Sequence, residues 1–257
     1  MSTKHKRIRK RGIYLLPNLL TLAAMFCGFF AIIAATNGWF SWAGYAIFTA
    51  ILLDGADGRV ARWTNTQSDF GAEFDSLADM VSFGVAPALV MFEFALGNMD
   101  RLDKVGWVAA FIYTATAALR LARFNTQVAV ADKRFFQGLA SPSAAAIVTG
   151  YVWVCDRYAL EHPLINVVAV FITISVGFLM VSNIRYHSFK GIDFRSKVQF
   201  VRLVALVMII AVIFSDPPTV LFTLFTLYAI SGPVLTLNEL RKRQKARRRQ
   251  SKQQNSS

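Results

Sequence analysis

Apolar stretches restrict the fold of this 257-residue sequence more than any other feature. A transmembrane helix needs about 20 predominantly apolar residues. Windows of about 19 residues find such stretches at 13–36, 39–53, 76–97, 105–122, 140–155, 163–184, 198–214 and 218–238. The pattern predicts an all-α, polytopic membrane protein with about eight transmembrane helices. We expect the first stretch to be a retained helix, because its apolar part is longer than that of a signal peptide.

The basic residues are distributed unevenly between the two sides that this topology creates. Lys and Arg number 28 against 15 Asp and Glu, which gives a formal net charge of +13. An even number of crossings places both termini on one side, and 25 of the 28 basic residues then lie on that side. The positive-inside rule therefore places both termini and the loops at 54–75 and 120–140 in the cytoplasm. We expect a multi-pass protein of the cell (inner) membrane, contacting anionic lipids and binding no nucleic acid.

The chain shows neither an internal repeat nor a linker rich in Gly and Ser. We expect a basic cytoplasmic N-terminus over 1–12, one transmembrane domain over 13–240, and a basic, disordered cytoplasmic tail over 241–257. Cys27 and Cys155 are assigned to opposite faces of the membrane, which argues against a disulfide between them.

Four aspartates are predicted at the cytoplasmic edge of the membrane, where ionisable groups are costly and indicate a functional site. The apolar run before Asp54 is too short for a hydrocarbon core of about 30 Å, so its helix must continue toward Arg62. Asp54 and Asp57 are spaced i, i+3 on that helix and share a face. Asp75 and Asp79 are spaced i, i+4 on the next helix and also share a face. Facing carboxylates repel unless cations bind between them.

An all-oxygen cluster of this kind suits Mg²⁺ or Mn²⁺, with Ca²⁺ as an alternative. Two ions match four carboxylates, and two-metal sites commonly serve phosphoryl chemistry. Gly58 and Gly71 allow a ligand or a second helix to approach the backbone. Arg59 or Arg62 can clamp phosphate oxygens. The alternative is that the first two aspartates cap a helix end and pair with these arginines.

The segment 54–79 reads D-x-x-D-G-x-x-A-R-x8-G-x-x-x-D-x-x-x-D and resembles the signature of the CDP-alcohol phosphotransferases at all eight defining positions. Members of that family are integral membrane enzymes, usually homodimers with a six-helix core. They join a CDP-linked substrate to an alcohol and release CMP. The resemblance implies that the eight helices surround such a core and that the chain forms a homodimer.

The resemblance also implies roles for individual residues. Asp54, Asp57, Asp75 and Asp79 would bind the two divalent ions, and Asp79 would be the general base that deprotonates the acceptor hydroxyl. The residues implied to bind the CDP-linked lipid are Gly58, Arg62, Ser68, Gly71, Asn18 and Thr21. For Asn18, a helix N-cap after Pro17 is an equal alternative.

Three further strings bear on the acceptor alcohol: SFGVAP at 82–87, LRLARFN at 119–125 and FQGLASPSAA at 136–145. They resemble the phosphatidylserine synthase branch of the family, with Ala140 where Pro is expected. This implies CDP-diacylglycerol and L-serine as substrates, with phosphatidylserine and CMP as products. In the third span, Gly84 and Pro87 predict a kink or a close packing contact.

Serine carries a carboxylate and an ammonium group, which need partners of opposite charge or polarity. The candidates for serine binding are Arg120, Arg123, Asn125 and Ser82. For the two arginines the alternative is a role as ordinary positive-inside anchors.

Other functions stay open at this point. The same chemistry could use glycerol 3-phosphate, inositol, inositol phosphate or choline as acceptor. An ion transporter or channel would use the acidic cluster differently, with acids distributed through the membrane. A basic scaffold protein would act through its tails and lose its function without residues 241–257.

Overall fold

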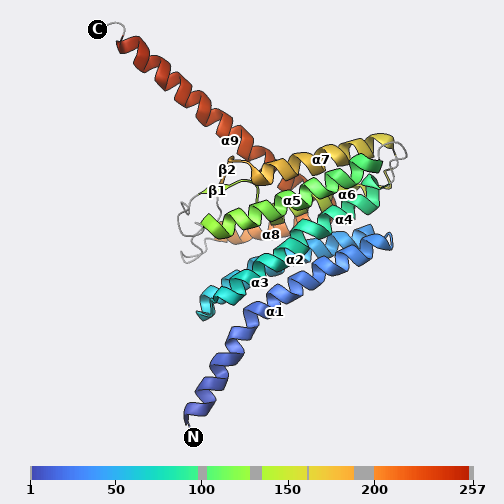
Figure 1. Ribbon diagram of the computed structural model, residues 1–257, viewed down its shortest axis with the longest axis vertical. Coiled ribbons are helices and arrows are strands. Elements are labelled where there is room, and N and C mark those ends of the chain that lie inside the picture. Colours follow the sequence, from blue (N-terminus) through green and yellow to red (C-terminus); the bar gives the residue numbers. More distant parts are fainter. Residues whose placement is uncertain (1, 98–102, 128–134, 161, 188–199, 255–257) are drawn as a thin grey trace.

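The computed structural model describes residues 2–97, 103–127, 135–160, 162–187 and 200–254 (Figure 1). The α-helices in these ranges are α1 (Ser2–Thr36), α2 (Phe40–Thr64), α3 (Asp69–Asp79), α4 (Ala86–Met91), α5 (Asp103–Gln127), α6 (Ser141–Arg157), α7 (Pro163–Val181), α8 (Phe200–Ser215) and α9 (Pro217–Gln254). Two π-helical segments, η1 (Met80–Val85) and η2 (Phe92–Leu96), join with α3 and α4 to form one long helix. Each of the eight predicted apolar stretches therefore overlaps a helix.

Within the described residues, five helical segments are long and apolar enough to cross a membrane: Leu15–Thr36, Asp69–Leu96, Lys104–Thr126, Pro163–Val181 and Pro217–Leu237. The prediction of an all-α, polytopic membrane protein is confirmed. Helices α6 and α8 have only 17 and 16 residues, and α2 carries two aspartates and two arginines in its second half. For these reasons the number of eight crossings stays a prediction.

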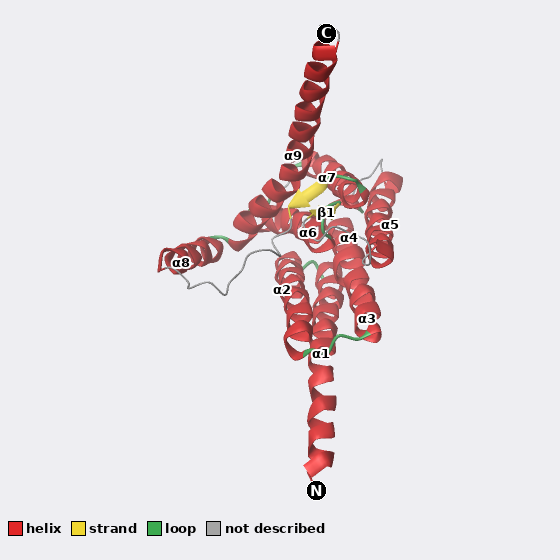
Figure 2. Cartoon of the chain, turned by 90° about the vertical axis from the view of Figure 1, so that its left-hand side faces the viewer, coloured by secondary structure: helices red, strands yellow, loops and turns green. Residues whose placement is uncertain are grey.

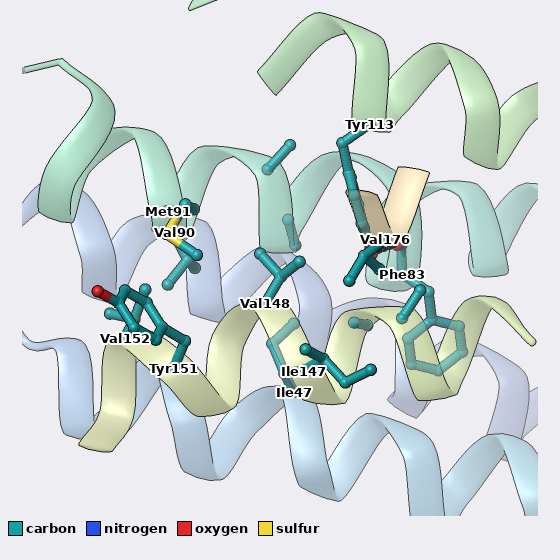
Figure 3. Close-up of a cluster of buried hydrophobic side chains, with 14 of the residues drawn as sticks. Ile47, Phe83, Val90, Met91, Tyr113, Ile147, Val148, Tyr151, Val152 and Val176 are labelled. Carbon is teal, nitrogen blue, oxygen red and sulfur yellow. Dashed lines mark hydrogen bonds between the residues drawn. The ribbon is translucent and has the colours of Figure 1, made fainter. Parts of the chain in front are cut away.

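Long neighbouring helices form the body of the protein, with α1 packed along α2, α5 along α7, and α6 between α2 and α9 (Figures 1 and 2). The buried interior contains many alanines, whose small side chains let helices approach closely in a membrane. Larger side chains fill the centre, among them Ile47 of α2, Met91 of α4 and Val148 of α6 (Figure 3). This packing fixes α2 and the long third helix relative to each other.

In the part of the chain that the structure describes, the all-helical prediction missed one small element, an antiparallel pair of strands formed by β1 (Phe135–Gln137) and β2 (Arg185–His187). Gly138 follows β1 with φ of +78°, and a Cβ at this position would lie 2.1 Å from the carbonyl oxygen of Met180. Only glycine fits that turn. The hydroxyl of Tyr186 in β2 donates a hydrogen bond of 3.1 Å to the carbonyl of Ala229, which ties the strands to α9.

Two of the loops expected on the charged side of the membrane differ from the structure. Helix α2 continues through Asp54 to Thr64, as the short apolar run predicted. Since α3 begins at Asp69, the expected loop at 54–75 is mostly helical. Residues 128–134, within the expected loop at 120–140, lie outside the described residues.

Both terminal segments also differ from expectation. Helix α1 begins at Ser2, so Asn18 lies inside the helix and the alternative of an N-cap there is wrong. Helix α9 continues to Gln254, through most of the segment expected to be a disordered tail. Residues 241–254 contain neither Gly nor Pro, and Lys, Arg, Gln and Ala all favour helix. Both ends extend away from the body of the protein (Figure 1).

Candidate active site

Helices α2 and α3 bring together the aspartates that the sequence singled out. Carboxylate oxygens of Asp54, Asp57 and Asp75 all lie within 4.8 Å of one another. The Asp79 carboxyl is at hydrogen-bonding distance from that of Asp54 and close to that of Asp75. Asp54 and Asp57 lie well inside α2, which ends at Thr64, so they do not cap a helix end.

The cluster has the properties of a divalent metal site. Asp57 is only 5% exposed, and the Oδ1 atom of Asp75 is buried without a hydrogen-bond partner. A buried carboxylate oxygen that lacks a partner is costly, and several such groups repel each other. A hard cation would compensate both effects, and carboxylate oxygens are the ligands that Mg²⁺ and Mn²⁺ prefer.

Helix α1 supports the cluster through Thr21, one of the residues expected to bind the CDP-linked lipid. Its hydroxyl lies 2.6 Å from Oδ2 of Asp57, to which it donates, and 3.1 Å from the carbonyl of Pro17. Thr21 is 4% exposed. This hydrogen bond restricts the orientation of the Asp57 carboxylate.

Three further lipid-binding candidates meet where α3 begins beside α1. Ser68 is the N-cap of α3, and its Oγ accepts a hydrogen bond of 3.1 Å from the Gly71 amide. A Cβ at Gly71 would lie 3.1 Å from that Oγ and 3.3 Å from Oδ1 of Asn18. Glycine therefore lets the polar groups of both helices gather at this point.

The remaining two lipid-binding candidates lie on α2, next to the cluster. Gly58 follows Asp57 directly, and the guanidinium of Arg62 lies 3.6 Å from the point where a Gly58 Cβ would be. Arg62 also interacts electrostatically with Asp57. Its side chain is exposed, which leaves its hydrogen-bond donors accessible to a phosphate.

Among the serine-binding candidates, Arg120 of α5 lies closest to the aspartates. Its guanidinium is near the Asp79 carboxyl, and its Nη1 donates a hydrogen bond of 2.7 Å to Oγ of Ser141. The Nε of Arg120 is buried without a partner. Ser141 is fully buried at the start of α6. Sequence reasoning gave Ser141 no role, although it belongs to one of the strings quoted above.

Arg123, one turn further along α5, holds neighbouring segments together. Its Nη2 donates to Oε1 of Gln137 at 2.5 Å and to Oδ1 of Asn183 at 2.7 Å. Its Nη1 donates to the carbonyl of Val181 at 3.3 Å. These contacts join α5 to β1 and to the end of α7, and they use donors that a substrate carboxylate would need.

Two other serine-binding candidates also contact protein groups. The amide of Asn125 lies 3.0 Å from Oγ of Ser76 on α3. Ser82 is 1% exposed, and its hydroxyl donates to the carbonyl of Ala24 on α1 at 3.1 Å. The structure therefore brings Arg120 to the aspartates and places Asn125 and Ser82 in contacts between helices.

The family profile described as CDP-alcohol phosphatidyltransferase matches residues 14–181, which include all four aspartates and Arg120. The chain belongs to this family.

Several curated relatives share the name CDP-diacylglycerol–serine O-phosphatidyltransferase. The protein of that name from Helicobacter pylori (strain ATCC 700392 / 26695) is 36% identical over 220 residues, which are 86% of this chain and 90% of the relative. The Mycobacterium tuberculosis (strain H37Rv) protein is 42% identical over 149 residues, 55% of this chain and 50% of the relative. The Methanocaldococcus jannaschii protein is 36% identical over 145 residues, with corresponding shares of 56% and 63%.

Proposed function

We propose that this membrane protein transfers the phosphatidyl group from CDP-diacylglycerol to the hydroxyl of L-serine, giving phosphatidylserine and CMP. The observation that carries the proposal is the group of four aspartates on α2 and α3 with Arg120 beside Asp79. Relatives of the same family are named for this reaction. An ion channel would need acids at several depths, whereas these four form one group.

The aspartates would hold two divalent ions, and Mg²⁺ or Mn²⁺ suits the donor set. Bound there, such ions would neutralise the diphosphate and stabilise CMP as the leaving group. Asn18, Ser68 and Gly71 at the α1–α3 contact, with Gly58 and Arg62 on α2, would bind the CDP moiety. Thr21 would keep Asp57 oriented through the hydrogen bond described above.

Asp79 would accept the proton of the serine hydroxyl as that oxygen attacks the phosphorus bearing the diacylglycerol. The new bond joins the serine oxygen to this phosphorus, and the bond from the phosphorus to the CMP oxygen breaks. Arg120 would bind the serine carboxylate, because its Nε has no protein partner and its guanidinium lies beside Asp79.

The proposal includes orientation and assembly. The distribution of 25 of 28 basic residues supports cytoplasmic termini, and the aspartates in the second half of α2 and in α3 would then face the cytoplasm at headgroup depth. A lipid held by its acyl chains presents its phosphates at that depth. We place the chain in the inner membrane and, by analogy with its family, as a homodimer.

The acceptor is tested by supplying the full-length protein in CDP-diacylglycerol vesicles with one labelled alcohol at a time. We expect CMP release and labelled lipid with L-serine, and background release with glycerol 3-phosphate, inositol, inositol phosphate and choline. Release with another alcohol and none with serine would overturn the serine assignment while keeping the family chemistry.

The two arginines of α5 are expected to respond differently to the same substitution. Arg120→Met should raise KM for serine about tenfold or more, because it removes a charged hydrogen-bond donor worth about 1.5–3 kcal/mol. Arg123→Met should leave KM for serine within about twofold and lower the thermal midpoint, because its hydrogen bonds join α5 to β1 and α7. Titrating serine against both variants and measuring their thermal unfolding separates the roles. Equal increases in KM would contradict this assignment.

A further inference from the structure

A π-helical turn lies directly after Asp79 in the long third helix. In η1 the Ala86 amide donates to the carbonyl of Val81, five residues earlier, instead of the usual four. Such a turn accommodates one extra residue, which rotates everything before it relative to everything after it. The direction in which Asp75 and Asp79 point from the packed part of this helix therefore depends on η1.

Pro87 accounts for an irregular helix at this place. In a regular α-helix the carbonyl of Phe83 would accept a hydrogen bond from the amide of residue 87. Proline has no amide hydrogen, and its ring clashes with the carbonyl four residues before it. Phe83 is 0% exposed, so its carbonyl cannot turn to water and needs another donor.

Tyr113 of α5 supplies that donor. Its hydroxyl donates to the carbonyl of Phe83 at 3.0 Å, and its side chain is also 0% exposed. Both residues belong to the buried cluster drawn in Figure 3. In apolar surroundings a carbonyl without a partner costs several kcal/mol. The contact with Tyr113 therefore favours the irregular backbone of η1 over a backbone in which this hydrogen bond is not formed.

Helix α1 holds the same turn from another side. Ser82 donates to the carbonyl of Ala24 at 3.1 Å, and a Cβ at Gly28 would come within 2.6 Å of the Cα of Ser82. With no side chain at Gly28, α1 contacts the backbone of η1 directly. The turn is thus held from two sides, by α1 through Ser82 and by α5 through Tyr113.

We propose that Tyr113 is a positioning residue for the reaction, which holds the π-helical turn so that Asp79 faces Asp54 across the metal-binding cluster. This inference rests on the proposed function, because it assigns Tyr113 to the placement of the proposed base. Tyr113 acts through the Phe83 carbonyl and the backbone of η1.

The test compares Tyr113→Phe with Tyr151→Phe in the full-length protein. Tyr151 is a matched control, because its hydroxyl donates to the carbonyl of Ile165 at 2.9 Å between α6 and α7, in a contact that does not involve η1. Each variant removes one hydroxyl that donates a hydrogen bond to a backbone carbonyl of a helix. We would measure kcat and KM with the alcohol that the wild type prefers, Mn²⁺ binding by electron paramagnetic resonance, and the thermal midpoint.

For Tyr113→Phe we expect kcat to fall and the Kd for Mn²⁺ to rise, each about 10- to 100-fold, as when a residue behind a metal ligand is removed. KM for the alcohol should change less than about twofold. Tyr151→Phe should lower the thermal midpoint alone. Equal changes of kcat or Mn²⁺ affinity in both variants, or none in Tyr113→Phe, would overturn the proposal. Mn²⁺ binding reports on Tyr113 even if serine proves not to be the acceptor.

A second variant covers the case in which Tyr113→Phe fails to fold. Pro87→Ala restores an amide donor for the Phe83 carbonyl and improves helix propensity, so it should fold at least as well as the wild type. Without Pro87 the helix has no reason to form the π-helical turn, and Asp79 would shift. We therefore expect kcat to fall about tenfold or more. Full kcat with unchanged Mn²⁺ affinity in Pro87→Ala would show that the turn does not position Asp79.

Discussion

Asp79→Asn is expected to lower CMP release about 100-fold or more, the contribution typical of a positioned general base. The amide cannot accept the proton of the attacking hydroxyl. It also removes one negative charge from a cluster in which Asp79 lies close to both Asp54 and Asp75. Repulsion in the ion-free protein falls as a result, so the variant should fold and insert as well as the wild type.

Glu73→Gln is the matched control for this experiment. Glu73 lies on the same helix, its side chain is exposed, and it stands outside the acidic pattern. The change removes the same charge, yet CMP release should stay within about twofold of the wild type, as for most surface substitutions. Release is measured in CDP-diacylglycerol vesicles at saturating serine and metal, with thermal unfolding as a check on folding. Wild-type turnover by Asp79→Asn would exclude Asp79 as the base.

The acidic part of the site could be predicted from sequence because it depends on local spacing. The i, i+3 and i, i+4 pairs follow from helical periodicity alone. The short apolar run before Asp54 required α2 to continue toward Arg62, and α2 ends at Thr64. Only one feature depended on residues of different helices, namely that the two pairs of aspartates face each other. Repulsion between the carboxylates already suggested that the pairs share a cation.

The part of the site proposed to bind the acceptor could not be predicted in the same way, because its contacts join segments far apart in the chain. Arg120 and Arg123 have similar sequence surroundings, yet one reaches Asp79 and Ser141 while the other reaches Gln137 and Asn183. Spacing on α5 does not tell which neighbours each side chain meets. The strand pair that supplies Gln137 has three residues per strand, too few for a period-two pattern to be recognised.

The irregular third helix is an intermediate case. Pro87 and Gly84 predicted a kink or close packing, and Pro87 also identifies Phe83 as the carbonyl that loses its amide donor. The sequence does not name the replacement donor, since Tyr113 lies 30 positions away on another helix. Sequence reasoning could locate the irregularity, whereas the packing of α5 against η1 determines what stabilises it.

Removal of divalent ions is expected to reduce CMP release to background, because four carboxylates cannot bind a diphosphate without cations between them. Treating the protein with a chelator and then adding back single ions tests this expectation. We expect Mg²⁺ or Mn²⁺ to restore release, since both accept all-oxygen ligands. Full activity in the chelator would contradict a metal-assisted reaction and leave the acidic cluster without its proposed role.

A variant pair connects this metal requirement to particular side chains. Asp57→Asn removes the charge of a proposed metal ligand and weakens the hydrogen bond from Thr21. The Mn²⁺ concentration for half-maximal activation should therefore rise by about tenfold or more. Asp156→Asn changes a carboxylate that accepts a hydrogen bond of 2.6 Å from Ser41, in a contact between α6 and α2 outside the cluster. That variant should keep the Mn²⁺ requirement of the wild type. Because both substitutions remove one negative charge, a shift in both would indicate a general effect of net charge, whereas a shift in Asp57→Asn alone assigns the ion to the cluster.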